Sequence, residues 1–394
     1  MVVIPSKMGC LNKRSLLSRL QQLGLASRAD LAKSLHMSQP TAGKIVDELL
    51  RLGILEEVDS KGQDKGVSDI PLKVGRPGRL LQLDQSQPRF LGIQLGVSET
   101  NLALLTIGSN GEDRWDATFK TPDSADKWVE QLRLGAEKIK QHDFWGVLVS
   151  MPGIVDEKKQ KVSFSPNLHW TEKADFSSLI NQIWQAPVEL IQEERALALG
   201  HQHVEFGGED FFLVDFGEGV GGAAVVGGRL YTNPLPINGE LGHTPILGNT
   251  RPCGCGAVGC VETLISTRGL MESFSSSDSK YSHTWSDLRR SIEMEGIPEW
   301  LSSTLHATGN VIAGALNVLG LKRVIITGSL AELPHSVFEK LTEFIERGAL
   351  WARFGKVECS IAPRRRTAGL VAVGIDRLLL PINTSDESHH TIRA

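Results

Sequence analysis

The first eighty residues show the hydrophobic pattern of short helices followed by extended segments. Apolar residues recur at three- and four-residue spacing along two segments, near residues 12–24 and 38–53. They are Leu16, Leu17, Leu20 and Leu23 in the first segment, and Ile45, Leu49 and Leu52 in the second. Ser27 and Ser38 stand where the N-caps of a second and a third helix are expected. Two strand-like segments then flank a Gly/Lys/Asp-rich loop, so we predict a winged helix-turn-helix over residues 1–83.

A different pattern begins after the polar segment Asp84 to Phe90, which we expect to be a hinge. Strand-like and helical segments alternate through two similar halves, near residues 90–200 and 205–380. This alternation predicts an α/β body with two lobes and a cleft between them. We expect the first lobe over residues 84–205, the second over residues 206–382, and a polar, disordered tail over residues 383–394.

The composition is that of a globular chain with more than one core. The 394 residues are 41% hydrophobic and 22% charged, which is ordinary for a soluble protein. No apolar run reaches eighteen residues, and the N-terminus lacks the long apolar core of a secretory signal. The sequence therefore predicts a cytoplasmic protein with no membrane partner.

The charge is divided unevenly along the chain. Residues 1–80 hold 13 Lys and Arg against 8 Asp and Glu, a balance of +5, while the remainder hold 29 against 38, a balance of −9. A basic head favours an anionic partner such as DNA, although a helical protein-docking module would have a similar pattern. The residues that we expect to contact DNA lie at the start of the third helix and in the GRPGR segment: Ser38, Gln39, Thr41, Lys44, Arg76 and Arg79.

Three of the five cysteines are clustered, while Cys10 and Cys359 are isolated. The clustered residues follow a histidine in the spacing H-x9-C-x-C-x4-C, formed by His243, Cys253, Cys255 and Cys260. Thiolates with one imidazole suit tetrahedral Zn²⁺, and four protein ligands leave no open position for a catalytic water. We therefore predict a structural zinc site, with a cluster of reduced thiols as the alternative.

Two carboxylates accompany the predicted zinc ligands. Glu240 lies three residues before His243, and Glu262 lies two residues after Cys260. If His243 binds zinc through one ring nitrogen, its other nitrogen can donate to a ligand, while each carboxylate can accept from hydroxyl groups. Such a set suits a polyol such as a sugar.

In this order, the motifs GEGVGG, GELGH and CGCGAVGCVE resemble the signature of the ROK family of repressors, open reading frames and sugar kinases. MPGIVD and SPNLHW upstream also match, and the resemblance covers roughly residues 88–380. It implies an actin-like ATPase/hexokinase fold, related to ribonuclease H, with a sugar in the cleft. The sugar contacts that it implies are Asn167, Gln192, Glu193, Glu240, His243 and Glu262. The N-terminal helix-turn-helix is typical of the family's repressors.

The chain departs from the family's kinases where they bind nucleotide. Gln94 stands in place of an aspartate, Glu99 in place of a lysine, and Glu218 in place of a threonine. These changes remove a carboxylate that helps to bind Mg²⁺-nucleotide and add negative charge beside the phosphates. Glu193 falls at the position of the kinases' catalytic base, although a shift of one residue would place Glu194 there. We expect no catalytic residue and no kinase activity.

The sequence therefore predicts a transcription regulator of carbohydrate genes that binds operator DNA through its head and a sugar or sugar phosphate through its body. A homodimer or tetramer is expected, because one short recognition helix gives too little affinity by itself. Two alternatives stay open at this point. One is an active ATP-dependent sugar kinase with a DNA-binding head. The other is a regulator controlled by a protein partner, such as a sugar-transport component, with a vestigial cleft.

Overall fold

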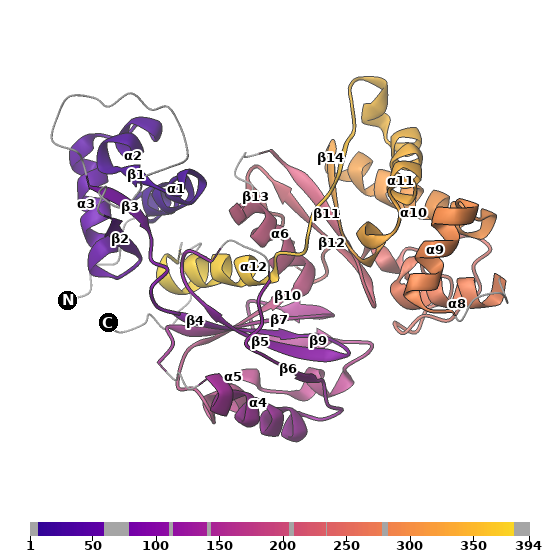
Figure 1. Ribbon diagram of the computed structural model, residues 1–394, viewed down its shortest axis with the longest axis horizontal. Coiled ribbons are helices and arrows are strands. Elements are labelled where there is room, and N and C mark those ends of the chain that lie inside the picture. Colours follow the sequence, from indigo (N-terminus) through magenta and orange to yellow (C-terminus); the bar gives the residue numbers. More distant parts are fainter. Residues whose placement is uncertain are drawn as a thin grey trace.

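A computed structural model gives the fold of residues 7–58, 79–109, 113–139, 143–204, 209–233, 235–277 and 283–381 (Figure 1). Most of the predicted wing loop, including Arg76, and the tail predicted to be disordered lie outside these described residues. The head contains the three helices and the paired strands that the hydrophobic pattern predicts. Their bounds are α1 (Lys7–Leu23), α2 (Arg28–Ser34), α3 (Gln39–Arg51), β1 (Ala26–Ser27), β2 (Leu55–Val58) and β3 (Leu80–Leu83), with strand order β1-β3-β2.

Both predicted N-caps in the head are confirmed. Oγ of Ser27 accepts from the Asp30 amide at 3.2 Å, and the Asp30 carboxylate accepts from the Ser27 amide at 3.3 Å, which forms a capping box. Oγ of Ser38 accepts from the Thr41 amide at 3.3 Å. The predicted apolar stripes are buried except at Leu23 and Leu52, whose exposed fractions are 42% and 41%. Each of these leucines immediately precedes a left-handed glycine, where the chain turns away from the helix axis.

The predicted hinge is not a free linker. Asp84 is buried, and its Oδ1 accepts from the Ser86 amide at 2.9 Å. Its amide donates to Ile54 of the head at 2.9 Å, while the amide of Gly108 in the body donates to its carbonyl at 3.2 Å. Backbone hydrogen bonds therefore join this segment to both the head and the body.

The body consists of two sheets with the same topology, as the two similar halves of the sequence predict. In each sheet, three antiparallel strands are followed by two strands that add in parallel, in the orders β10-β7-β4-β5-β6 and β13-β12-β11-β14-β15. The first contains β4 (Phe90–Leu95), β5 (Glu99–Leu105), β6 (Ala117–Lys120), β7 (Gly146–Met151) and β10 (Val188–Gln192). The second contains β11 (Phe211–Phe216), β12 (Val220–Val226), β13 (Arg229–Leu230), β14 (Arg323–Gly328) and β15 (Glu358–Ile361).

Helices cover the outer faces of both sheets (Figure 1). On the first sheet these are α4 (Ala125–Ile139) and α5 (Phe176–Asn181), beside a ribbon of β8 (Ile154–Asp156) and β9 (Lys161–Phe164). On the second they are α7 (Glu262–Ile265), α8 (Thr267–Ser277), α9 (Trp285–Glu295), α10 (Glu299–Leu319) and α11 (His335–Gly348).

Two helices, α6 (Glu193–Val204) and α12 (Arg366–Val373), lie side by side between the sheets (Figure 1). They are in close contact, because a Cβ atom on Gly200 would lie 2.1 Å from the carbonyl oxygen of Arg365, and one on Gly369 would lie 1.9 Å from that of Ala196. α12 and the π-helical turn η6 (Gly374–Leu379) pack against the first sheet. The prediction that the second lobe continues to residue 382 is therefore wrong for this segment, whose apolar residues are buried in the core of the first lobe.

Candidate functional site

A cleft of about 640 Å³ lies between the two lobes, within the usual range for small-molecule sites. Its walls come from the turn between β4 and β5, the loop after β7, the start of α6, the turn between β11 and β12, and the segment from Glu240 to Glu262. The residues that the resemblance assigns to sugar binding all line this one cavity: Asn167, Gln192, Glu193, Glu240, His243 and Glu262.

The predicted metal ligands meet at one wall of the cleft. The ligand atoms of His243, Cys253, Cys255 and Cys260 all lie within 4.8 Å of one another. Nδ1 of His243 lies 3.6 Å from Sγ of Cys253, and Sγ of Cys255 lies 3.7 Å from Sγ of Cys260. Tetrahedral coordination at about 2.3 Å to sulfur and about 2.0–2.1 Å to nitrogen separates ligand atoms by roughly 3.5–3.8 Å. These distances fit a tetrahedral ion.

The imidazole of His243 lies between the cysteines and the cleft. Its Nδ1 atom faces Cys253, and its Nε2 atom lies 3.7 Å from Oε2 of Glu240. A metal bound at Nδ1 would leave Nε2 as a donor toward the cleft. Burial raises the pKa of the Cys253 thiol to about 12, so a nearby cation is required to hold it as a thiolate.

The two predicted carboxylates are fixed differently. Oε1 of Glu240 accepts from Nε2 of Gln192 at 2.9 Å, which joins the second lobe to the first across the cleft. Oε2 of Glu262 accepts from the amide of Val220 at 2.9 Å, which joins the metal loop to the Gly-rich turn. Burial raises the pKa of Glu240, although His243 opposes the shift. Asn167 is exposed at the mouth of the cleft.

The resemblance to the kinases places a nucleotide in the other half of the cleft, where the chain departs from the kinase pattern at three residues. Gln94, Glu99 and Glu218 all line the cleft. Oε1 of Gln94 accepts from Nδ2 of Asn101 at 2.7 Å, so its amide is oriented by the neighbouring strand. The hydroxyl of Ser98 donates to the Glu218 carboxylate, which connects the two turns across the cleft.

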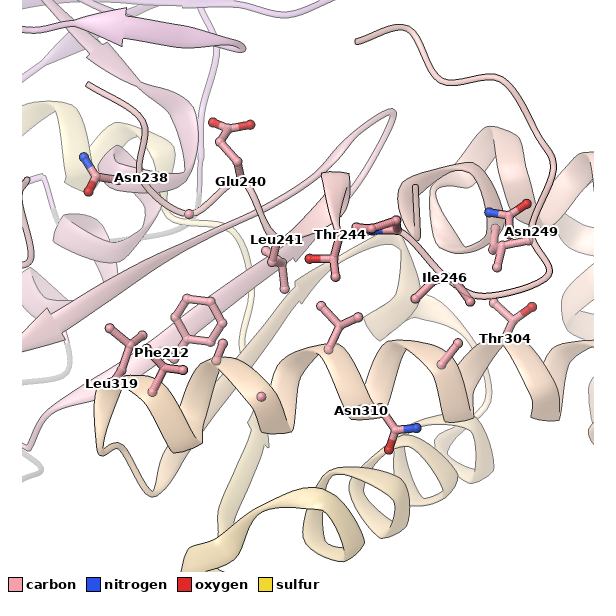
Figure 2. Close-up of a pocket in the computed structure, with 18 of the residues that line it drawn as sticks. Phe212, Asn238, Glu240, Leu241, Thr244, Ile246, Asn249, Thr304, Asn310 and Leu319 are labelled. Carbon is pink, nitrogen blue, oxygen red and sulfur yellow. The ribbon is translucent and has the colours of Figure 1, made fainter. Parts of the chain in front are cut away.

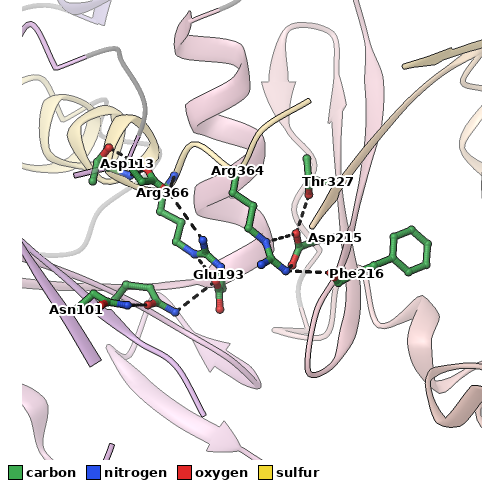
Figure 3. Close-up of polar contacts among 10 residues, drawn as sticks. Asn101, Asp113, Glu193, Asp215, Phe216, Thr327, Arg364 and Arg366 are labelled. Atoms are coloured by element: carbon green, nitrogen blue, oxygen red, sulfur yellow. Dashed lines mark hydrogen bonds and ion pairs between the residues drawn. The ribbon is translucent and has the colours of Figure 1, made fainter. Parts of the chain in front are cut away.

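Two arginines that the sequence analysis did not select complete this half (Figure 3). Arg366 donates from Nε to Oε1 of Glu193 at 2.7 Å, so the carboxylate at the base position is ion-paired. Arg364 forms a bidentate pair with Asp215, at 2.7 Å and 2.8 Å, and also donates to the carbonyl of Phe216 at 3.0 Å. The run Arg364-Arg365-Arg366 before a helix was the available signal, but the sequence did not indicate its partners.

A family model described as the ROK family matches residues 90–374. This chain belongs to the ROK family. It is 30% identical over 273 residues to a putative xylose repressor from Caldicellulosiruptor sp. (strain Rt8B.4), a match that covers 66% of this chain and 65% of that protein. It is 25% identical to the xylose repressor of Caldicellulosiruptor bescii, over 94% of this chain and 96% of that protein.

A solved structure has the same ROK fold together with the head. The crystal structure of a ROK family transcriptional regulator, a homologue of the E. coli MLC protein, superimposes with a TM-score of 0.70 at 19% identity. The match covers 93% of this chain and 96% of that chain. The predicted family and fold class are therefore confirmed.

The head of this ROK protein exposes the predicted DNA-contacting residues of α3. Ser38, Gln39, Thr41 and Lys44 are all exposed, although Ser38 also caps the helix and lies 2.8 Å from the Thr41 hydroxyl. Arg79 forms an ion pair with Glu57 on the adjacent strand, so its guanidinium is already partnered. Arg76 lies outside the described residues.

The head is attached directly to the two helices between the ROK lobes. α1 contacts α6, and Arg14 on α1 pairs with the Asp376 carboxylate at 3.1 Å and donates to its carbonyl at 2.7 Å. One apolar cluster includes Leu16 and Leu20 of the head together with Leu370 of α12. Among the helices in the described part of the chain, none is long and apolar enough to cross a membrane.

A second and larger concavity, of about 1310 Å³, runs along α10 beside the cleft (Figure 2). It is lined mainly by apolar and uncharged side chains, among them Phe212, Leu241, Ile246 and Leu319. The charged groups and metal ligands converge on the smaller cleft instead. We therefore assign the chemistry of this ROK protein to the cleft.

Proposed function

We propose that this protein is a sugar-responsive, DNA-binding transcriptional repressor of carbohydrate-metabolism genes. The observation that carries the proposal is the continuous contact between the cleft and the head. Glu193 and Arg366 are the first residues of α6 and α12, and they meet at the cleft. About 15 Å further along the second helix, at 1.5 Å per residue, Asp376 holds Arg14 of the head. The xylose repressors among the relatives support the same function.

The effector acts by favouring one arrangement of the head over another. A sugar whose hydroxyl groups bond to Gln192 and donate to the carboxylates of Glu193 and Glu240 competes with the contacts that now join these residues to Arg366 and to each other. Because α6 and α12 are closely packed, a shift at their cleft ends moves them together against α1. The ligand changes operator affinity only by its difference in affinity for the two arrangements.

The remaining site residues have supporting roles in this proposal. A structural Zn²⁺ held by His243, Cys253, Cys255 and Cys260 fixes the wall that carries Glu240 and Glu262, and Asn167 contacts the sugar at the mouth. The residues Ser38, Gln39, Thr41 and Lys44, together with Arg76 and Arg79, contact operator DNA. The protein works as a homodimer or tetramer, because a palindromic operator presents two half-sites. It does not act as a sugar kinase, because Glu193 is ion-paired and the turns that would face a nucleotide are acidic.

The proposal is tested by selecting operator sequences from random duplex DNA with the purified protein and then titrating the selected DNA by fluorescence anisotropy. We expect nanomolar binding at about physiological salt. At least one sugar or sugar phosphate in a panel is expected to change the operator affinity by about 5- to 150-fold. Selection of no sequence, or an operator affinity that no panel member changes, would contradict the proposal.

A further inference from the structure

The cleft carries far more negative than positive charge. Seven acidic residues line it, against two arginines, which gives a formal balance of −5 when all are ionised. The acidic residues are Glu99, Glu193, Glu194, Asp215, Glu218, Glu240 and Glu262, and the basic ones are Arg364 and Arg366. The excess of negative charge favours a free sugar over a sugar phosphate, because a phosphate group carries a charge of about −1.5 to −2 at neutral pH and is repelled by the carboxylates.

Both arginines are already paired with carboxylates of the cleft. Nε and Nη2 of Arg364 donate to the two carboxylate oxygens of Asp215, and Nη2 also donates to the carbonyl of Phe216. Burial by itself would raise the pKa of Asp215, but Arg364 holds it below its usual range. Arg366 pairs with Glu193 at 2.7 Å and lies 3.8 Å from Asp113. A phosphate that drew either guanidinium away from its partner would leave a largely buried carboxylate unpaired.

The groups that would surround a phosphate are themselves acidic. Glu99 and Glu218 lie on the two turns that face each other across the cleft, and Ser98 already donates to Glu218. The two carboxylates on the sugar side, Glu240 and Glu262, accept hydrogen bonds from hydroxyl groups and add further negative charge.

Glu194 also lines the cleft and has a carboxylate oxygen without a hydrogen-bond partner among the described residues. The residue is half-buried at the start of α6, and the oxygen without a partner, Oε2, is buried. Burial, followed by the nearby charges of Glu193 and Glu240, raises the pKa of Glu194 well above its usual value. Its carboxyl therefore suits a sugar hydroxyl, to which it can donate or from which it can accept.

We infer that the effector of this cleft is a sugar without a phosphate group, and that Glu194 is one of the residues that contact it. This inference rests on the proposed function and narrows it, since that function allows a sugar or a sugar phosphate. Phosphorylated sugars are disfavoured because both guanidinium groups in the described cleft are already paired with carboxylates, and because Glu99 and Glu218 add further negative charge to the cavity that a phosphate would enter.

The test is calorimetry on the full-length protein with matched pairs: glucose, N-acetylglucosamine, fructose and xylose, each beside its terminal phosphate ester. In any pair that binds, we expect the free sugar to bind at least tenfold more tightly than the ester. Equal or tighter binding of the ester would overturn the inference while leaving a sugar-responsive regulator intact. If neither member of any pair binds or changes operator affinity, the proposed function itself fails and the inference fails with it.

Two substitutions sharpen this test. Glu99→Gln removes one charge that faces the phosphate, so it should strengthen binding of the ester several-fold and change binding of the free sugar by less than twofold. Glu194→Ala should weaken binding of the free sugar about tenfold, while Glu194→Gln, which keeps the hydrogen bond, should recover most of the loss. An ester affinity that Glu99→Gln does not change, or a sugar affinity that Glu194→Ala does not change, contradicts the corresponding half of the inference.

Discussion

Nε of Arg366 lies 2.7 Å from Oε1 of Glu193, so the first residues of two helices close one end of the cleft with an ion pair. The resemblance to the ROK kinases places Glu193, or Glu194 after a shift of one residue, at the position of the catalytic base. A general base needs a carboxylate oxygen within reach of the hydroxyl group whose proton it takes, and Oε1 of Glu193 is occupied by Arg366.

We therefore predict that the purified protein does not phosphorylate sugars. A coupled assay of ATP consumption with common hexoses and N-acetylhexosamines should show turnover no faster than the blank. Glu193→Ala provides the matched control, because contaminating kinases would be unaffected by it. Robust turnover that disappears in this variant would identify the protein as an active kinase.

The contact between Arg14 and Asp376 gives a second prediction, about communication between the lobes and the head. Arg14→Met keeps the aliphatic part of the side chain but removes the ion pair at 3.1 Å. We expect sugar binding and ligand-free operator binding to stay within about threefold, while the sugar's effect on operator affinity falls toward none. Arg347→Met, which removes a surface pair with Glu343 on α11, is the control and should keep the full response. If the sugar changes the operator affinity of Arg14→Met as much as that of the wild-type protein, the contact between Arg14 and Asp376 does not transmit the effect of the sugar.

Removal of a predicted metal ligand gives the third prediction. Cys255→Ser should lose bound zinc in mass spectrometry or atomic absorption and should weaken sugar binding at least about tenfold, because His243 and Glu262 lose their fixed wall. Cys359→Ser changes a cysteine outside the cluster and should keep one zinc per chain. Unchanged zinc content in Cys255→Ser would show that the four residues do not hold the metal.

The exposed start of α3 gives the fourth prediction. Lys44→Ala should weaken operator binding and reduce the slope of log affinity against log salt by about one if this residue contacts a phosphate. Gln39→Ala should instead reduce discrimination between operator variants by about 1–3 kcal/mol, as expected for a base contact. Lys127→Ala, on α4 of the body, should change neither quantity. If Lys44→Ala keeps the operator affinity and the salt slope of the wild-type protein, Lys44 does not contact the DNA backbone.

The buried pair of Arg364 and Asp215 gives the fifth prediction, about stability. Asp215→Ala leaves a buried guanidinium unpaired and should lower the free energy of unfolding by about 3–5 kcal/mol. Because Arg364 holds the pKa of Asp215 below its usual range, the stabilisation is present at neutral pH and is lost as the pH falls through that lowered pKa. Chemical denaturation at several pH values measures both effects. Asp123→Ala, which removes the exposed pair with Lys127, should change stability far less. An equally small effect for Asp215→Ala would contradict this role.

Local signals in the sequence predicted a large part of this molecule. Ser27 and Ser38 specify where two helices begin, because a cap acts within three residues of its own position. The spacing of the cysteines after His243 is also a local signal, because four side chains within eighteen residues can reach one ion. It predicted that these four residues lie together.

What the sequence did not indicate depends on contacts between distant segments. Arg364 meets Asp215 from 149 positions away, and Arg366 meets Glu193 from 173 positions away. The sequence of a run of arginines is the same whether their side chains face solvent or buried carboxylates. The ion pairs of Arg364 and Arg366 can therefore be identified only from the folded structure. The same limit explains the misplaced end of the second lobe, because α12 returns to the first sheet after the chain has passed through the second.

If sugar in the cleft and DNA at the head are coupled through the body, each ligand must change the affinity for the other by the same factor. The measurement is the affinity for the effector sugar with and without saturating operator, beside the operator affinity with and without saturating sugar. We expect both ratios to equal the same factor, between about 5 and 150, and Arg14→Met to bring both toward one. A sugar that binds tightly while both ratios stay at one in the wild-type protein would contradict this coupling.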